Sequence, residues 1–203
     1  MSVQPFWQQV YQDPNAVAFS KDPTADLAEF HHLIASNSTV LDVGCGEGRN
    51  AIFLAGLGHH AEGFDLSKAG IAKAQAIAAA QNLDIRFWAQ DLGKFAFARD
   101  YDVILSHGVL HLPEKSVRDA FIKLAQAHTK PSGLHFIGVF TNRLPVAPDM
   151  VDVTKSLFDV GELPAMYDGW EILQHYEGTF RDEHPGGVCH HHAYERMIAR
   201  KTK

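Results

Sequence analysis

Short apolar runs alternate with segments of helical character along most of the chain. Residues 24–36 already place apolar side chains at helical spacing. The pattern then predicts strands over residues 39–43, 60–65, 84–89, 101–106 and 134–140. Between them it predicts helices over residues 47–57, 67–81 and 113–130, with Ser67 as the N-cap of the second. This alternation indicates an α/β fold with a doubly wound, mostly parallel sheet.

The last third of the chain changes character. Residues 141–150 contain two prolines and predict a loop of the kind that often covers a site. Residues 170–180 and 189–199 predict two strands joined around the turn sequence HPGG at 184–187. An antiparallel C-terminal strand pair would complete a seven-stranded mixed sheet.

Composition and charge narrow the classes of partner. The 203 residues carry a net charge of −6, and the 18 Lys and Arg are scattered, which argues against a nucleic-acid partner. Two distant cysteines form neither a disulfide framework nor a CxxC motif. The sequence has no signal-peptide pattern at its start and no apolar run of membrane-spanning length. We therefore expect a cytoplasmic protein without a membrane partner.

The stretch VLDVGCGEGRN, residues 40–50, ends the first predicted strand with a glycine-rich loop. A dinucleotide loop reads G-x-G-x-x-G, but Arg49 stands where its third glycine would fall, and Asp42 and Glu47 would repel a pyrophosphate. S-adenosylmethionine has no phosphate, and its ammonium and sulfonium are positive. Asp42 can attract that cationic end, while the helix N-terminus serves the ligand carboxylate. The loop therefore favours a cationic ligand.

Two further acids follow the next two predicted strands. Asp65 could accept both ribose hydroxyls, and Asp91 could accept from an adenine amino group. Each of the three aspartates could instead cap the helix or turn that follows it. The register of all three behind a glycine loop favours ligand binding.

With these motifs the chain resembles the class I S-adenosylmethionine-dependent methyltransferases, through VLDVGCGEGRN, GFDLS, AQDL and YDVILSHGVLHLP. The resemblance implies a Rossmann-like methyltransferase fold in one domain, residues 1–203, with a helical cap (1–36), a cofactor-binding core (37–140) and a loop with the strand pair (141–203). It implies that the methionine part of the cofactor meets Gly44, Cys45 and Gly46, the ribose meets Asp65 and Leu66, and the adenine meets Asp91 and Leu92. Ser106 and His107 would face the amino-acid end and the methyl group. The matching motifs also contain Arg49, Asn50 and Ser67, which complete the expected cofactor-binding set with Asp42.

Within that class the chain resembles the tellurite-resistance methyltransferases, through GRN, the spacing to YDVILS, and the tail motifs YDGWEIL and MIARK. Those relatives carry a His-Arg pair in the tail with a catalytic role. The corresponding stretch here is GTFRDEHPGG, in which Arg181 and His184 are the candidate replacements. The expected acceptor is a small molecule, possible examples being tellurite, selenite or a thiol.

Methyl transfer to a soft anion needs no base, whereas an oxygen or nitrogen nucleophile can require one. His107 is the candidate base, with a local structural role as its alternative, and His111 is interpreted as structural. The predicted strand before them does not end in the Asn/Asp-Pro-Pro-Tyr type sequence of DNA amino-methyltransferases, which also favours a small acceptor. Such an enzyme would be a monomer or a homodimer.

Two segments have alternative interpretations. Phe6, Trp7 and Tyr11 could form an aromatic lid or a helix packed on the sheet. In HPGGVCHHHAYE, a strand would put Cys189 and His191 on one face and His190 and His192 on the other. The cluster could bind zinc or an anionic substrate, but it lacks the paired spacing of a zinc motif, so we expect no metal.

Two other functions compete with methyl transfer. A nicotinamide-dependent oxidoreductase is disfavoured by Asp42, by Arg49 and by the absence of a Tyr-x-x-x-Lys pair. A non-catalytic S-adenosylmethionine-binding protein would share the same cofactor motifs, because only the acceptor site distinguishes the two.

Overall fold

The computed structural model describes residues 5–13, 15–148, 150–184 and 188–203, with only the backbone of His184 and Val188. Seven strands form one sheet in the order β3-β2-β1-β4-β5-β7-β6. The strands are β1 (Thr39–Val43), β2 (His60–Asp65), β3 (Arg86–Ala89), β4 (Tyr101–His107), β5 (Thr129–Phe140), β6 (Trp170–His184) and β7 (Val188–Lys201). The first five run parallel, and β7 is antiparallel to both β5 and β6. The predicted doubly wound sheet with an antiparallel C-terminal pair is confirmed.

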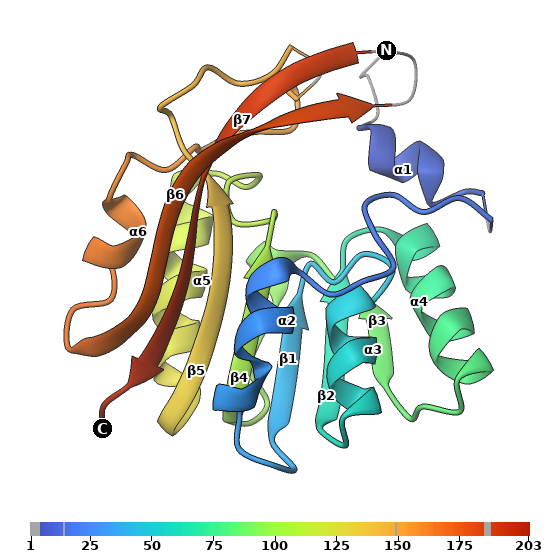
Figure 1. Cartoon of the computed structure of the whole chain (residues 1–203), viewed down its shortest axis with the longest axis vertical. Coiled ribbons are helices and arrows are strands. Elements are labelled where there is room, and N and C mark those ends of the chain that lie inside the picture. Colours follow the sequence, from blue (N-terminus) through green and yellow to red (C-terminus); the bar gives the residue numbers. More distant parts are fainter. Residues whose placement is uncertain (1–4, 14, 149, 185–187) are drawn as a thin grey trace.

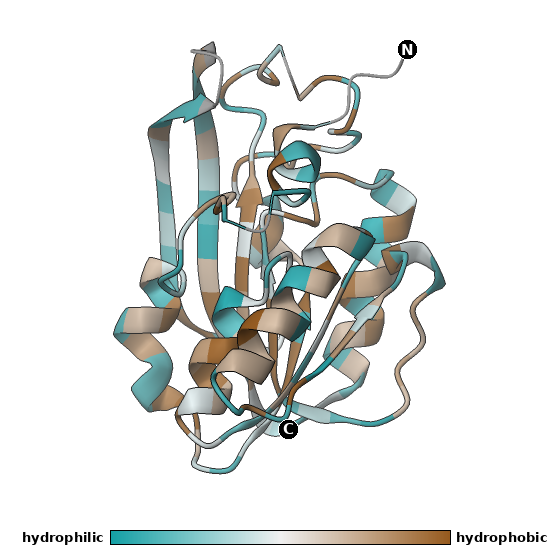
Figure 2. Cartoon of the chain, turned by 90° about the vertical axis from the view of Figure 1, so that its right-hand side faces the viewer, coloured by the Kyte–Doolittle hydropathy of each residue, from teal (hydrophilic) through white to brown (hydrophobic). Residues whose placement is uncertain are grey.

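Helices cover both faces of the sheet (Figure 1). They are α1 (Phe6–Val10), α2 (Ala25–Phe30), η1 (His31–Leu33), α3 (Arg49–Gly56), α4 (Lys68–Ala80), η2 (Leu92–Lys94), α5 (Lys115–Ala127) and α6 (Glu162–Ala165). The buried side chains of α2, α3 and α4 pack on one face, and those of α5 and α6 pack on the other. Because alternate strand residues point to opposite faces, Val40 belongs to the first cluster and Leu41 to the second. Figure 2 shows hydrophobic and hydrophilic residues alternating along the helices, as this packing requires.

The structure corrects several expected boundaries. The helix predicted over 24–36 is shorter, as α2 and the 3-10 turn η1. Strand β5 begins at Thr129 rather than at 134, and α5 ends at Ala127. Pro131-Ser132-Gly133 does not form a turn before the strand. These residues instead form a register shift within β5. Thr129 pairs with Tyr101 of β4, and Leu134 pairs with Val103, so the two strands advance by different numbers of residues between these pairs.

Strands β6 and β7 are longer than predicted and extend past the carboxyl ends of the parallel strands (Figure 1). They curve over that edge towards α1, which lies on the opposite side of it. In the described part of the chain, no helix has both the length and the apolar character that crossing a membrane requires.

Candidate active site

A cavity of about 1290 Å³ lies at the carboxyl ends of the parallel strands. Its floor is formed by the residues that follow β1, β2, β3 and β4, which is where ligands bind in open α/β sheets. Other walls come from residues 5–11 and 17–20 of the N-terminal segment and from the extended ends of β6 and β7. Segments far apart in the sequence therefore meet around a single space.

The glycine loop after β1 adopts a conformation that only glycine takes easily. Gly44 and Gly46 have φ angles of 65° and 55°. A Cβ atom on Gly46 would lie 2.4 Å from the hydroxyl oxygen of Tyr11, and one on Gly44 would lie 2.0 Å from a methyl carbon of Val109. The loop backbone therefore approaches both the N-terminal segment and the segment after β4 closely.

The three strand-end aspartates make local hydrogen bonds and also line the cavity. Asp42 accepts from the N–H of Ala51 at 3.2 Å, in the first turn of α3. Asp65 accepts from the N–H groups of Gly46 at 2.9 Å and Ser67 at 2.7 Å. Asp91 accepts from the N–H of Gly93 at 2.9 Å. The capping interpretation is thus correct for each of them, and it is compatible with a position facing a ligand.

Burial raises the pKa of two of these carboxyl groups, those of Asp42 and Asp65. Asp42 is 2% exposed, and its burial raises its pKa to about 6. Burial likewise raises the pKa of Asp65, although its two backbone hydrogen bonds oppose the shift. A positive ligand group beside Asp42 would stabilise the charged form and offset the cost of burying it.

His107, at the end of β4, also lines the cavity. Its Nε2 lies 2.8 Å from the Oδ2 of Asp26, a buried residue of α2. Burial tends to raise the pKa of Asp26, but the charge and hydrogen bond of His107 hold it well below its ordinary value. Nδ1 of His107 is buried without a hydrogen-bond partner among the described residues. This pair places an imidazole, held by a carboxylate, on the cavity wall.

Most of the expected cofactor-binding residues come together at the cavity. Those that line it are Asp42, Gly44, Cys45, Gly46, Arg49, Asn50, Asp65, Leu66, Asp91, Leu92 and His107. The other two do not: Ser67 caps α4 by accepting from the N–H of Gly70 and donates to Gln8, and Ser106 is fully buried in β4. Burial also raises the pKa of Cys45 well above its usual value, so its thiol stays protonated and forms part of the cavity wall.

The candidate catalytic residues of the tail have different positions. Arg181 is not among the lining residues; its side chain is exposed, and its Nε contacts the Cys189 sulfur at 2.7 Å. Its strand neighbours Asp182 and Glu183 are among the lining residues instead. The side chain of His184 lies outside the described residues.

His111 fits the structural role expected for it, although it also lines the cavity. It is 1% exposed, and burial lowers its pKa to about 3, so its ring is neutral at pH 7. Its Nδ1 accepts from the N–H of Phe140 at 3.2 Å. The ring is therefore held in place by the backbone of β5.

Sequence reasoning did not anticipate several lining residues. Tyr11 belongs to the expected aromatic lid, but no sequence pattern predicts its contact with Gly46 and Gly70. Arg196 and Glu195 line the cavity from a strand next to the more conspicuous histidines. Asp26 does not line the cavity itself but contacts the lining residue His107 from α2. No local pattern marks these residues, because only the fold brings them to their partners.

Comparison with known proteins assigns the chain to a family. Residues 22–185 match the family described as Tellurite resistance protein TehB. The chain belongs to the TehB family. Hemagglutinin 1 of Eikenella corrodens is 33% identical over 140 residues, which are 68% of this chain and 46% of that protein. The probable S-adenosyl-L-methionine-dependent methyltransferase TehB of Haemophilus influenzae strain 10810 is 30% identical over 172 residues, 83% of this chain and 59% of that protein. The chain thus spans about half the length of these curated relatives.

Solved structures show the same fold. The crystal structure of TehB from Haemophilus influenzae superposes with a TM-score of 0.77 at 24% identity, covering 96% of this chain and 65% of that one. The 1,6-didemethyltoxoflavin-N1-methyltransferase of Burkholderia thailandensis gives a TM-score of 0.63 at 21% identity, over 89% and 78% of the two chains. The predicted Rossmann-like methyltransferase fold and the resemblance to the tellurite-resistance family are both confirmed.

Proposed function

We propose that this chain is an S-adenosylmethionine-dependent methyltransferase that acts on a small molecule. The observation that carries the proposal is the convergence of the glycine loop with three strand-end aspartates on one cavity. Membership of the TehB family supports it, since curated members of that family are named as probable enzymes of this kind.

The charges of the cavity floor fit this cofactor. Asp42 and Asp65 are carboxylates at positions where a pyrophosphate would be repelled, and Asp42 suits a positive group. Asp65 and Asp91 keep lone pairs beyond their backbone hydrogen bonds, and these can accept from hydroxyl and amino groups. Arg49 stands beside them and can meet a carboxylate. When bound, the cofactor supplies an electrophilic methyl group on a sulfonium that is already a good leaving group.

The protein then contributes alignment and the handling of one proton. Alignment comes from a cavity walled on several sides, which fixes the acceptor relative to the methyl group. His107 can take a proton from an oxygen or nitrogen acceptor, and Asp26 holds its ring in place. A soft anionic acceptor would need only the alignment.

The cavity also has room for a second molecule. Its volume of about 1290 Å³ exceeds the roughly 300–1,000 Å³ of an ordinary ligand pocket. Arg49 and Arg196 both line it and give it positive groups among its acidic ones. A small anionic acceptor, such as tellurite, selenite or a thiolate, fits these features.

A methyl-transfer assay tests the proposal. Purified protein is incubated with S-adenosylmethionine and either tellurite or selenite, and S-adenosylhomocysteine and volatile methylated product are measured together. Formation of both supports the proposal and this acceptor class. Formation of neither, with cofactor binding intact, moves the search to thiols and other small nucleophiles.

Two variants test whether S-adenosylmethionine binds at the cavity floor. Asp65→Asn should abolish most cofactor binding, whereas Asp84→Asn, at an exposed acid before β3, should leave it unchanged. Failure of the wild-type protein to bind S-adenosylmethionine would contradict the proposal. Binding without turnover on any acceptor would favour a non-catalytic role.

A further inference from the structure

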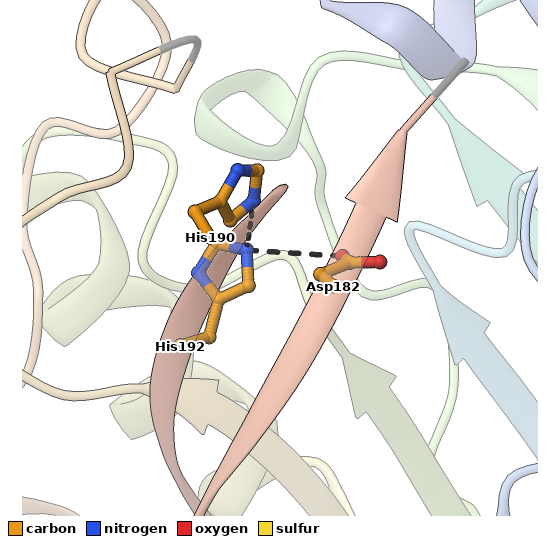
Figure 3. Close-up of side chains that lie close together, drawn as sticks. All are labelled: Asp182, His190 and His192. Carbon is orange, nitrogen blue, oxygen red and sulfur yellow. Dashed lines mark hydrogen bonds and ion pairs between the residues drawn. The ribbon is translucent and has the colours of Figure 1, made fainter. Parts of the chain in front are cut away.

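Three potential metal ligands lie close together on the extended ends of β6 and β7: Asp182, His190 and His192 (Figure 3). The Nε2 atoms of the two histidines are 2.9 Å apart, and Nε2 of His192 lies 3.8 Å from the Oδ2 of Asp182. All three ligand atoms lie within 4.8 Å of one another. The strand alternation predicted for Cys189–His192 is confirmed, since His190 and His192 are buried and their neighbours Cys189 and His191 are exposed.

These spacings match the ligand set of a tetrahedral ion. Zinc holds nitrogen and oxygen ligands at about 2.0–2.2 Å, so two ligands at the tetrahedral angle lie about 3.4 Å apart. The observed 2.9 Å and 3.8 Å bracket this value to within about half an ångström. The 2.9 Å separation is that of a hydrogen bond between the two imidazoles, which a bound ion would replace, whereas the 3.8 Å separation exceeds that of a hydrogen bond and fits two ligands of one ion.

Strand pairing and ring stacking hold the three candidate ligands in place. In the register of β6 and β7, Asp182 lies directly opposite His190. The ring of His192 stacks on Phe140 at 4.2 Å between centroids, and Phe140 stacks in turn on His111 at 4.3 Å. Paired strands and stacked rings hold side chains more tightly than an exposed loop does, which lowers the cost of arranging them around an ion.

Asp182 and His192 also line the cavity described above, so a fourth coordination position on that side would face it. Two neutral imidazoles and one carboxylate around a divalent ion leave one net positive charge at that position. We infer that Asp182, His190 and His192 bind a divalent transition metal of the zinc type, with an open position that takes an anionic donor atom from a ligand in the cavity. Zinc sites with three protein ligands and an open position are the kind that bind such donors.

This inference changes the expectation drawn from the sequence. The run CHHH has no paired spacing, so the sequence alone favours no metal. The third ligand, Asp182, comes from the other strand, and only the strand register shows that it belongs to the cluster. Metal binding does not depend on the proposed methyl transfer, and the two can be tested separately.

The test uses full-length protein prepared without a polyhistidine tag or a nickel column and stripped with a chelator. Zn²⁺ or Co²⁺ alone is added, excess is removed by desalting, and the retained metal is measured by mass spectrometry. We expect one ion per chain and, with Co²⁺, the intense visible absorption of a tetrahedral site that lacks thiolate ligands. Absence of stoichiometric metal overturns the inference, as does a cobalt–thiolate band from Cys189.

Matched variants assign the ligands. His190→Ala and His192→Ala should each weaken Co²⁺ binding by at least the roughly 10–100-fold that loss of a supporting group costs. His191→Ala, on the exposed face of the same strand, should bind as the wild type does. Equal loss in all three variants, or no loss in any, would show adventitious binding by surface histidines and overturn the inference.

Folding and cofactor binding are checked independently. Each variant's thermal midpoint and its affinity for S-adenosylmethionine are measured; if an alanine variant fails to fold, His192→Gln and Asp182→Asn replace it. A wild-type protein that retains no added Zn²⁺ or Co²⁺ but binds S-adenosylmethionine would end the metal inference and leave the proposed function standing. A protein that binds the metal but not S-adenosylmethionine would contradict the proposed function and leave the metal inference standing.

Discussion

At the scale of single residues, the strand-end carboxylates serve the fold and the cavity together. Asp65 bonds to two backbone N–H groups, Asp42 and Asp91 to one each, and all three line the cavity. A carboxylate has about four lone-pair sites, so these local bonds do not exhaust its capacity. The loops that form the site are thus fixed by the same groups that can bind the ligand, which favours a preformed site.

We predict that affinity for S-adenosylmethionine falls as the pH drops through about 6. Burial raises the pKa of Asp42 to about 6, so its carboxylate is charged at about pH 8 and neutral at about pH 5. A cationic ligand favours the charged form, hence the dissociation constant should rise towards acid. Calorimetric titration across this range measures it.

Asp42→Asn is the control for this pH dependence. The variant should bind weakly at every pH and lose most of the step, leaving only the contribution of Asp65, whose pKa is also raised. A step of full size in Asp42→Asn would assign the titration to another group.

We predict that His107→Ala lowers methyl transfer more than cofactor affinity. For an acceptor that must lose a proton, loss of a general base costs about 10²-fold or more in kcat. The dissociation constant of S-adenosylmethionine should change far less. Equal loss of turnover and affinity would show that His107 is not a base.

Asp26→Asn tests whether Asp26 positions His107. Without the carboxylate, the ring of His107 loses the partner that holds its Nε2, so kcat should decrease for an acceptor that must lose a proton, while the dissociation constant of S-adenosylmethionine should change little. Asp22→Asn, at an exposed residue before the same helix, should leave kcat unchanged. Equal loss of kcat and cofactor affinity would indicate a merely structural role.

At the scale of elements, the sequence predicts what local patterns determine. The glycine loop, the Ser67 cap and the five parallel strands follow from turn chemistry and apolar periodicity. The start of β5 could not be predicted, because the composition of Pro131-Ser132-Gly133 is typical of a turn. Only the pairing of Thr129 with Tyr101 shows that the strand begins before it. The contacts of Tyr11 and Asp26 could not be predicted for the same reason, since they depend on partners 35 or more residues away in the sequence.

We predict that Gly46→Ala destroys cofactor binding mainly through a clash with Tyr11. The new Cβ would lie 2.4 Å from the Tyr11 hydroxyl, and the φ of 55° adds about 1–2 kcal/mol of strain. Gly56→Ala, at the end of α3 with open space around it, is the matched control and should bind normally. Equilibrium binding of S-adenosylmethionine measures both.

Tyr11→Phe in the Gly46→Ala background separates the clash from the strain. Removing the hydroxyl leaves the nearest Tyr11 ring carbon 3.4 Å from the added Cβ, an ordinary contact. Binding should therefore recover in part. No recovery would mean that backbone strain alone accounts for the loss.

At the scale of the whole molecule, the N-terminal segment and the hairpin end of β6 and β7 form walls of the cavity. The N-terminal segment and the extended β6–β7 pair both reach over the carboxyl edge of a sheet built by the middle of the chain (Figure 1). The connection between β5 and β6 must stay in place for β6 to do so. Its position depends on Arg118, whose fully buried side chain in α5 donates to the backbone oxygen of Ser156 and to Glu162, and stacks on Phe158.

We predict that Arg118→Met lowers the free energy of unfolding by about 1–3 kcal/mol, because it removes the hydrogen bonds of a buried guanidinium to the partly buried Ser156 carbonyl and Glu162 carboxylate. Lys115→Met is the matched control: it removes an exposed partner of the same Glu162, at 59% side-chain exposure, and should leave the free energy of unfolding nearly unchanged. Neither residue lines the cavity, so cofactor affinity per folded molecule should be unchanged. Urea unfolding measures the difference.

Acid should reduce that difference. Burial tends to raise the pKa of Glu162, but its hydrogen bonds with Lys115, the Asp159 backbone and Arg118 hold it below its usual value. A carboxyl whose pKa is lower in the folded state stabilises above its unfolded pKa of about 4.3, and the contribution is lost as pH falls through the folded value. The gap between wild type and Arg118→Met should therefore narrow below about pH 4. A constant gap would assign the loss to packing on Phe158, and equal losses in the two variants would show that burial adds nothing to the pair.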